Sequence, residues 1–370
     1  MAKEIWKGDY AYAETALRAG CNFYSGYPIT PASELMEYMS VHMPEYGGVF
    51  IQADNEANIG AMLYGAGAAG AYAMTASSAP GGTLLQESMS WASKYDLPFV
   101  VVQAQRYGGG TSTQRSDGQT DYKRDTNSGG QGDYRSIVYG PGSVQETCDL
   151  LYNAWDKAFR YRCTVVMHIG RNLAQLSEAV ELPPRKERKP APAWCLNGTY
   201  HTYDPALGPD DPRGYAPEHL ESLVNDPEKY LAFDKARWDA IIENEQMWDA
   251  GGLEDADYVL VGYGLPGRAV KKTALDLRAA GEKVGYIRPV TLWPFPQKAF
   301  DQINPHVKGI VTYEVNTTGQ MKFDVAVAIK RAIPQRNVPV YAYYYGVPFG
   351  VEKMNTVYRS VISGEMKPEL

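Results

Sequence analysis

The stretch that decides the fold is Gly26-Tyr27-Pro28-Ile29-Thr30-Pro31-Ala32-Ser33-Glu34, which connects a strand-like run at 21–24 to a helical pattern. A strand that leads directly into a helix is the unit of an α/β fold, and ligands bind at such turns because they lie at the carboxyl edge of a parallel sheet. Thr before Pro is also a common helix start. We therefore predict Thr30 as an N-cap and Pro31 as the first helical residue, and we keep the Thr30 hydroxyl as a candidate ligand-binding group.

The same alternation of strand-like and helical runs extends from this junction to about residue 177. Further β-branched or aromatic runs lie at 49–52, 71–75, 99–102 and 164–167. This rhythm predicts an α/β domain with a mostly parallel sheet. The run 57–70 is rich in Ala and Gly and nearly free of charge, so we expect a buried helix that can approach a sheet or a partner subunit closely.

The length of 370 residues exceeds that of a typical single core, so we expect two compact domains. We assign 1–180 to the first α/β domain. Proline and charge mark 181–255 as a connecting arm, which includes an amphipathic stretch at 235–248. The α/β rhythm resumes with strand-like runs at 258–261 and 309–314, so we assign 256–370 to a second, smaller domain.

Composition excludes several classes of protein. Apolar residues make up 44% and charged residues 21%, which fits a globular enzyme better than a disordered chain. The formal charge is -7 and the basic run at 185–189 is short and contains a glutamate, so nucleic acid is not an expected partner. The first residues lack the apolar core of a signal peptide and no stretch reaches the ~18 apolar residues of a membrane span, so we expect a cytoplasmic protein without a span.

The cysteines and histidines do not form a metal-binding pattern, so we assign no metal ligand to this chain. None of the four cysteines belongs to a C-x-x-C pair, and the five histidines show no metal-ligand spacing. Any redox cluster is therefore expected on a partner.

Glu56 is the first candidate catalytic residue. It lies in Gln52-Ala53-Asp54-Asn55-Glu56-Ala57-Asn58, directly after a strand-like run and at the start of the apolar helix. Acidic residues are favoured at helix N-termini by the helix dipole, which is a purely structural explanation. In the functional interpretation, a carboxyl group in a dry interface exchanges a proton with a heterocyclic nitrogen.

Arg106 is the second candidate, at the end of a strand-like run that enters the glycine-rich segment 108–113. A guanidinium group there can bind a carboxylate through two hydrogen bonds, and glycines let backbone amides approach an anion. A solvent-facing arginine beside a flexible loop is the structural alternative. The small-residue segment 77–82 has the same two interpretations.

The sequence Gly262-Tyr263-Gly264-Leu265-Pro266-Gly267 matches the dinucleotide-binding pattern G-x-G-x-x-G. That pattern also requires an acidic residue at the end of the next strand, where this chain has Ile287-Arg288-Pro289. Pro266 moreover lies inside the turn. We therefore do not predict nicotinamide binding.

The order of these motifs resembles the alpha subunits of thiamine diphosphate-dependent 2-oxoacid:ferredoxin oxidoreductases over nearly the whole chain. The first motif is Gly26-Tyr27-Pro28-Ile29-Thr30-Pro31 with the preceding 16–21. The second domain adds 287–296 and Gly319-Gln320-Met321 with Asp324. Within the family, the runs 45–50, 132–135 and 144–146 are most similar to the branched-chain (3-methyl-2-oxobutanoate) branch.

The resemblance implies a thiamine diphosphate-binding domain of the pyrimidine type with a parallel sheet, followed by a smaller α/β domain like the transketolase C-terminal domain. It implies that Glu56 contacts N1′ of the aminopyrimidine, that Thr30 hydrogen-bonds the substrate and that Arg106 pairs with the substrate carboxylate. It implies a cofactor-binding set of Glu56, Pro28, Ile29, Ser78 and Pro80.

The resemblance also implies partners and a reaction. A beta subunit would bind the diphosphate and its Mg²⁺, and the partner subunits, including gamma and a ferredoxin-like delta subunit, would carry [4Fe-4S] clusters. The complex would convert a 2-oxoacid and coenzyme A to acyl-CoA and CO₂, with ferredoxin or a flavoprotein subunit receiving the electrons.

Some features depart from the family pattern and leave more than one function open. Asp54 stands where relatives usually have Glu, Ala79-Pro80-Gly81-Gly82 replaces a more familiar loop, and the run 114–131 beside the substrate side is longer than expected. The 28 tyrosines suit an aryl 2-oxoacid, as in a phenylglyoxylate-type enzyme that passes electrons to NAD through a flavoprotein subunit. The sequence is also compatible with a non-catalytic scaffold subunit, and with simple decarboxylation without electron transfer.

Overall fold

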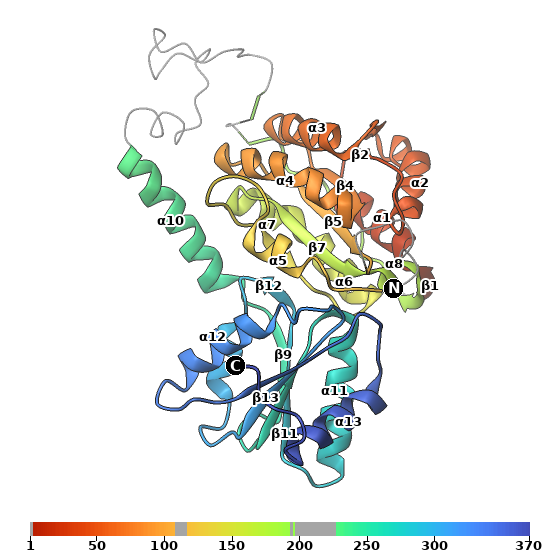
Figure 1. The fold of residues 1–370 in the computed structure, drawn as a ribbon. Helices are drawn as coiled ribbons and strands as arrows, with labels where there is room; N and C mark the ends of the chain where they lie inside the picture. The colour runs from red at the N-terminus through yellow and green to blue at the C-terminus, as the bar shows by residue number, and fades with distance from the viewer. Residues whose placement is uncertain (1–2, 108–116, 193–194, 197–226) are drawn as a thin grey trace.

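Seven strands form the first sheet of the computed structural model, which describes residues 3–107, 117–192, 195–196 and 227–370 (Figure 1). Their order is β12-β6-β7-β5-β4-β2-β3, and every neighbouring pair is parallel except β12 and β6. The bounds are β2 (Phe23–Gly26), β3 (Val49–Gln52), β4 (Ala73–Ser78), β5 (Val100–Gln105), β6 (Ile137–Tyr139), β7 (Val165–Gly170) and β12 (Thr291–Trp293).

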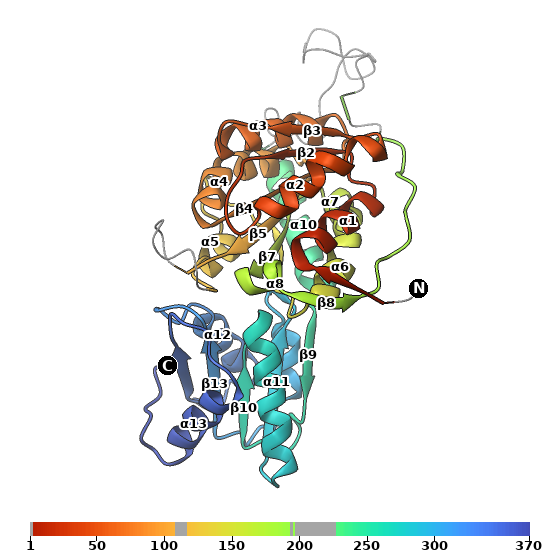
Figure 2. The same ribbon diagram turned by 90° about the vertical axis from the view of Figure 1, so that its right-hand side faces the viewer.

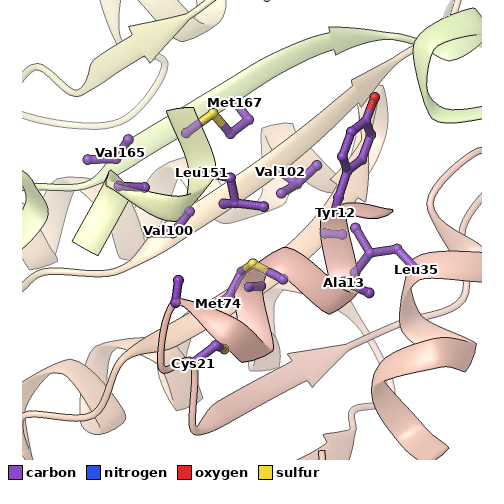
Figure 3. Close-up of a cluster of buried hydrophobic side chains, with 14 of the residues drawn as sticks. Tyr12, Ala13, Cys21, Leu35, Met74, Val100, Val102, Leu151, Val165 and Met167 are labelled. Carbon is purple, nitrogen blue, oxygen red and sulfur yellow. The ribbon is translucent and has the colours of Figure 1, made fainter. Parts of the chain in front are cut away.

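Helices cover both faces of this sheet because successive strand residues point to opposite faces. On one face Val100, Val102, Val165 and Met167 pack with Tyr12 and its neighbours (Figure 3). On the other face Val101 and Val166 belong to a second core. The helices of this domain are α1 (Gly8–Arg18), α2 (Ser33–His42), α3 (Glu56–Ala68), α4 (Ala79–Lys94), α5 (Tyr122–Asn127), α6 (Val144–Tyr152), α7 (Ala154–Tyr161) and α8 (Arg171–Gln175), with the 3₁₀ turn η1 (Pro44–Tyr46). A separate antiparallel pair joins β1 (Glu4–Lys7) to β8 (Ser177–Val180).

A second sheet of five strands lies below the first in Figure 1. Its order is β14-β13-β10-β11-β9, and β9 is its antiparallel member. The elements of this domain are β9 (Trp248–Gly251), β10 (Tyr258–Val261), β11 (Val284–Pro289), β13 (Gly309–Glu314) and β14 (Val340–Tyr344), with α11 (Gly264–Ala279), η2 (Gln297–Gln302), α12 (Lys322–Ala332) and α13 (Val351–Ile362).

The two sheets exchange segments. β12 follows β11 in the chain but pairs with β6 of the first sheet, with Thr291 opposite Tyr139. β9 belongs to the predicted connecting arm but pairs with β11. The same arm contributes α10 (Pro227–Asn244), which lies beside the first domain (Figure 1 and Figure 2). Its Arg237 forms a buried ion pair with Asp96 of that domain. The boundaries at 180 and 255 stay predictions, and the described segments α10 and β9 of the arm contact the first and the second domain, respectively.

Most predicted elements agree with the observed ones. The strands predicted at 49–52, 258–261 and 309–314 have those bounds in the structure. α3 is apolar along its length, as expected, but it is not fully buried: Ala57, Ala61 and Gly65 form an exposed row of small residues. Among the described residues, no helix has the length and apolar character needed to cross a membrane.

Candidate active site

The candidate residues meet at the carboxyl edge of the first sheet. Thr30 follows β2, Glu56 follows β3, Ser78 ends β4 and Arg106 follows β5. These four strands are consecutive in the sheet, in the order β5-β4-β2-β3. Because they are parallel, their following loops lie at one edge, which is where ligands bind in α/β folds.

Arg106 is fixed by a backbone contact with the loop after β2. Its Nη1 donates a hydrogen bond of 3.0 Å to the carbonyl oxygen of Thr30. The residue is only 6% exposed, and Nε is buried without a hydrogen-bond partner among the described residues. Burial lowers the pKa of Arg106, and the carboxylates of Asp121 and Glu56 act in the opposite direction. Arg106 is thus an oriented cation with donor capacity left for a ligand, which argues against the solvent-facing alternative.

The prediction that Thr30 caps a helix is wrong. α2 begins at Ser33 with Ala32 as its N-cap, and no side chain caps it. A turn closed by the hydrogen bond from Ala32 N to Ile29 O, 2.8 Å long, precedes the helix, so Thr30 and Pro31 lie outside it. Thr30 is exposed and contributes its carbonyl to Arg106, which leaves its hydroxyl available to a ligand.

Glu56 is the first residue of α3, as predicted, but it does not cap the helix. The side chain of Asn55 is the cap and accepts from Asn58 N at 3.0 Å. Glu56 is 6% exposed, and no described residue donates a hydrogen bond to its carboxyl group. Asn55, not Glu56, therefore caps the helix. The Glu56 carboxyl group has no hydrogen-bond donor among the described residues, as the functional interpretation requires.

Gly81 allows the start of α4 to approach Glu56. A Cβ atom at Gly81 would lie 2.4 Å from Glu56 Oε1 and 2.1 Å from Ser77 Oγ, so only glycine fits. The hydroxyls of Ser77 and Ser78 are buried without partners, although Ser78 is the N-cap residue of α4. Pro80 lies in the first turn of α4 and is exposed.

The described part of the long run 114–131 lies beside the site, where the sequence analysis expects it, and its contacts, which the sequence did not reveal, build one wall of the site. Arg124 Nη1 donates a 2.7 Å hydrogen bond to Ala79 O at the start of α4, and Arg124 Nε pairs with Asp125 at 2.8 Å. Asp125 in turn lies 2.7 Å from Nδ1 of His168 on β7. Thr120 Oγ1 donates to Arg106 O at 3.5 Å. The charged residues within 121–125 are the sequence signal from which this wall could have been predicted. Residues 108–116 lie outside the described residues.

The second-domain motifs form the contact between domains rather than the site. Gln320 Nε2 donates to Thr120 O at 2.7 Å and its Oε1 accepts from Lys123 N at 2.8 Å. Asp324 accepts from Tyr122 Oη at 2.9 Å. These contacts hold the segment that forms the wall of the site.

The glycine-rich segment 262–267, which leads into α11, also contacts the first domain. Tyr263 O accepts from Gln119 Nε2 at 3.1 Å. Arg288 binds both oxygens of Glu146 at 2.8 Å. Arg288 is therefore committed to a structural ion pair, which removes the cation that a nucleotide 2′-phosphate would need.

The observed groups fit the aminopyrimidine end of thiamine diphosphate. The cofactor needs a carboxyl group that can exchange a proton with a ring nitrogen, and Glu56 has one without a protein partner. Ser77 and Ser78 add two buried hydroxyls without partners. Pro28 is exposed and Ile29 half-buried in the loop beside Thr30. Glu56, Ser78, Pro80, Pro28 and Ile29 are the residues that would hold this group.

A large hollow elsewhere in the described chain lies outside this site. A hollow of about 990 Å³ lies under the arm segment 185–191 and is lined by Gly20, Asn22 and Tyr72 at the amino end of the sheet. It has no residue in common with Thr30, Glu56 and Arg106. In the described ranges, no three His, Cys, Asp or Glu side chains are grouped closely enough to bind a metal ion.

Two family domains match the chain. Residues 14–244 match the family described as pyruvate flavodoxin/ferredoxin oxidoreductase, thiamine diphosphate-binding, and residues 256–354 match pyruvate:ferredoxin oxidoreductase core domain II. The ketoisovalerate oxidoreductase subunit VorB of Methanothermobacter marburgensis is 36% identical over 336 residues, which cover 89% of this chain and 90% of the relative.

Solved structures share the fold. The 2-oxoglutarate:ferredoxin oxidoreductase of Magnetococcus marinus, solved with 2-oxoglutarate, coenzyme A and succinyl-CoA, is similar with a TM-score of 0.77 and 25% identity. The similarity covers 97% of this chain but only 65% of the longer chain. A split-gene transketolase, an inactive beta4 tetramer, has a TM-score of 0.52 at 12% identity and covers 96% of each chain, which supports the predicted transketolase-like fold.

Proposed function

This chain belongs to the pyruvate flavodoxin/ferredoxin oxidoreductase family, and on that premise we propose that it is the alpha subunit of a 2-oxoacid:acceptor oxidoreductase. The complex converts a 2-oxoacid and coenzyme A to acyl-CoA and CO₂ and passes two electrons to an acceptor. The observation that carries the proposal is the meeting of Arg106, Thr30 and Glu56 at one sheet edge, through the 3.0 Å hydrogen bond between Arg106 and Thr30 and the proximity of Glu56.

Arg106 binds and orients the substrate carboxylate. The hydrogen bond to Thr30 O restricts the guanidinium plane, so less conformational freedom is lost when a carboxylate binds. Nε has no partner among the described residues and can donate to that carboxylate. The exposed hydroxyl of Thr30 hydrogen-bonds the same substrate at its oxo or carboxylate group, which sets the orientation of the reacting carbon.

Glu56 holds a proton at N1′ of the aminopyrimidine and exchanges it with that ring nitrogen. When bound, thiamine diphosphate supplies a nucleophilic carbon and an electron sink for loss of CO₂. The close approach of α4 at Gly81 limits water around Glu56 Oε1, which favours a direct proton transfer.

The chain supplies half of the active site in this proposal, and a beta subunit binds the diphosphate and Mg²⁺. The exposed row Ala57, Ala61 and Gly65 extends along α3 from Glu56 and lets a partner backbone approach the carboxyl group. Leu84 and Trp91 on α4, the helix that packs against α3, are exposed as well. These residues support the assignment of the beta subunit to this face.

The iron-sulfur clusters belong to partner subunits, gamma and a ferredoxin-like delta subunit among them. All four cysteines of this chain are buried and unpaired with one another. Burial raises the pKa of the Cys21, Cys148 and Cys163 thiols to about 12, which disfavours the thiolate that a cluster requires. Electrons then pass to ferredoxin or to a flavoprotein subunit.

We assign a branched-chain 2-oxoacid as substrate, because the relative VorB is named a ketoisovalerate oxidoreductase subunit. The test uses the purified complex with coenzyme A and a viologen dye. Pyruvate, 2-oxoglutarate, 3-methyl-2-oxobutanoate and phenylglyoxylate are supplied in turn, and we expect the fastest dye reduction with 3-methyl-2-oxobutanoate.

Each remaining outcome indicates a different function. A preference for phenylglyoxylate would indicate the aryl 2-oxoacid enzyme. Aldehyde release without dye reduction would indicate simple decarboxylation. No reduction with any of the acids, with thiamine diphosphate and clusters present, would favour a scaffold subunit.

A further inference from the structure

Asp121 lies at the N-terminus of α5, in a segment that packs against the backbone of Arg106. It is the residue before α5, and its neighbour Thr120 hydrogen-bonds Arg106 O at 3.5 Å. A Cβ atom at Gly118 would lie 3.1 Å from the carbonyl carbon of Arg106 and 2.7 Å from Tyr107 N, so the segment is in close contact with the end of β5. The side chain of Asp121 is 18% exposed.

The ion-pair partner of Asp121 is Arg124, not Arg106. Asp121 Oδ1 is 3.5 Å from Arg124 Nη1, and Asp121 Oδ2 is buried without a partner among the described residues. Arg124 is also committed to Asp125 and to Ala79 O. Asp121 therefore acts on Arg106 through its electrostatic field and does not hold it by a hydrogen bond.

We infer that Asp121 is a positioning residue whose negative charge sets how tightly Arg106 holds the substrate carboxylate. The inference rests on the proposed function, in which Arg106 binds that group. A second carboxylate near the Arg106 cation opposes the arrival of the substrate carboxylate, and the low dielectric of the site strengthens this opposition. The effect is weaker ground-state binding, which favours release of bound acid when the reaction does not proceed.

The charge of Asp121 depends on pH in a defined direction. Burial raises the pKa of Asp121, Arg124 lowers it, Asp125 raises it, and His168 and Arg106 lower it. Arg124 and Asp125 face it from α5, His168 from β7 and Arg106 from the end of β5. Because the folded pKa lies above the ordinary value, Asp121 loses its charge as pH falls through that raised pKa, and KM for the 2-oxoacid falls with it.

The experiment compares Asp121→Asn with Asp121→Glu in the assembled complex, using steady-state kinetics with the preferred 2-oxoacid. Asparagine keeps the shape and an acceptor for Arg124 but removes the charge, so KM is expected to fall by about tenfold with kcat within about twofold. Asp121→Glu keeps the charge and is expected to keep KM within about twofold. Asp133→Asn is the control, because it removes an exposed carboxylate of the same domain outside the run 114–131 and is expected to leave KM unchanged.

An unchanged or raised KM in Asp121→Asn would overturn the inference, since a purely structural role predicts weaker binding. If that variant does not assemble, Asp121→Ser, which also removes the charge, is measured at the same pH. A fall in KM with kcat unchanged supports the inference, and an unchanged or raised KM overturns it. A wild-type complex that turns over no 2-oxoacid overturns the proposed function and this inference together, whereas wild-type turnover with an unresponsive Asp121→Asn overturns the inference alone.

Discussion

Arg106 Nη1 donates a 3.0 Å hydrogen bond to Thr30 O, although the two residues are 76 positions apart in the chain. The contact links the loop after β5 to the loop after β2, on either side of β4. The start of α4, which follows β4, therefore lies between two fixed loops. Glu56 faces this start at Gly81.

Glu56→Gln should reduce turnover by at least about 100-fold, because glutamine keeps the shape but cannot exchange a proton with a ring nitrogen. The measurement is 2-oxoacid-dependent dye reduction by the assembled complex. Asp54→Asn is the matched control, since Asp54 lies in the same loop, is exposed and pairs only with Asn58 among the described residues. Turnover retained in Glu56→Gln, with assembly intact, would exclude the role assigned to Glu56.

Arg106→Lys should raise KM for the 2-oxoacid by about 10- to 100-fold with a smaller effect on kcat. Lysine keeps the charge but loses the planar group that contacts Thr30 O and a carboxylate together. Substrate saturation curves of both proteins give the answer. Arg135→Lys is the control, because Arg135 hydrogen-bonds only the carbonyls of Asn127 and Tyr134 among the described residues. Equal KM values for Arg106→Lys and wild type would contradict the assignment.

Gly346→Ala should impair activity although Gly346 belongs to the second domain. A Cβ atom there would lie 2.6 Å from the ring of Tyr107, the residue after Arg106, so the ring or the loop must move. A displacement of about 1 Å at a substrate-orienting group can reduce the rate by about 100-fold. We expect a loss of at least about tenfold in kcat/KM.

Gly350→Ala is the control for this prediction, because nothing lies within 4 Å of a Cβ atom at Gly350 and its φ of -108° suits alanine. Equal kcat/KM in the two variants would show that the contact between Gly346 and Tyr107 does not position Arg106.

Asp117→Asn should stabilise the protein at neutral pH. Burial raises the pKa of Asp117 to about 6, against an ordinary value of 3.8. A raised folded-state pKa gives stability that is fully present below the unfolded pKa and is lost as pH rises through about 6, so the ionised group destabilises the fold at pH 7.5. The gain from asparagine should be about 3 kcal/mol at pH 7.5 and about 1 kcal/mol at pH 4.5.

Urea unfolding at the two pH values measures this gain. Asp133→Asn is the control, since Asp133 is exposed and its substitution should change stability by less than about 0.5 kcal/mol. A gain for Asp117→Asn that does not depend on pH would show that the carboxyl group does not titrate as described.

The strands at 49–52, 258–261 and 309–314 could be predicted from sequence because each is a continuous run of strand-forming residues. β6 and β12 could not, because each has only three residues and exists through tertiary pairing: β12 with β6, Thr291 opposite Tyr139, and β6 also with β7. The prediction of Thr30 as a helix cap was wrong, because a turn closed by Ala32 N and Ile29 O precedes the helix, which begins at Ser33. The order of the strands that carry Glu56 and Arg106, and the contacts of these two residues, were not predicted from the sequence, because they depend on which strands pair in the folded sheet.

The sequence by itself determined the α/β class, the start of α3 at Glu56, the place of Arg106 at a strand end and the family resemblance. Each of these depends on local propensity or on residue identity, which a linear pattern contains. The tertiary structure alone decided that Arg106 is held by Thr30 O, that Asp121 and Arg124 form a wall of the site and that Arg288 joins the domains through Glu146. These contacts join residues far apart in the chain, because burial forces polar groups to find partners wherever the packed fold brings them.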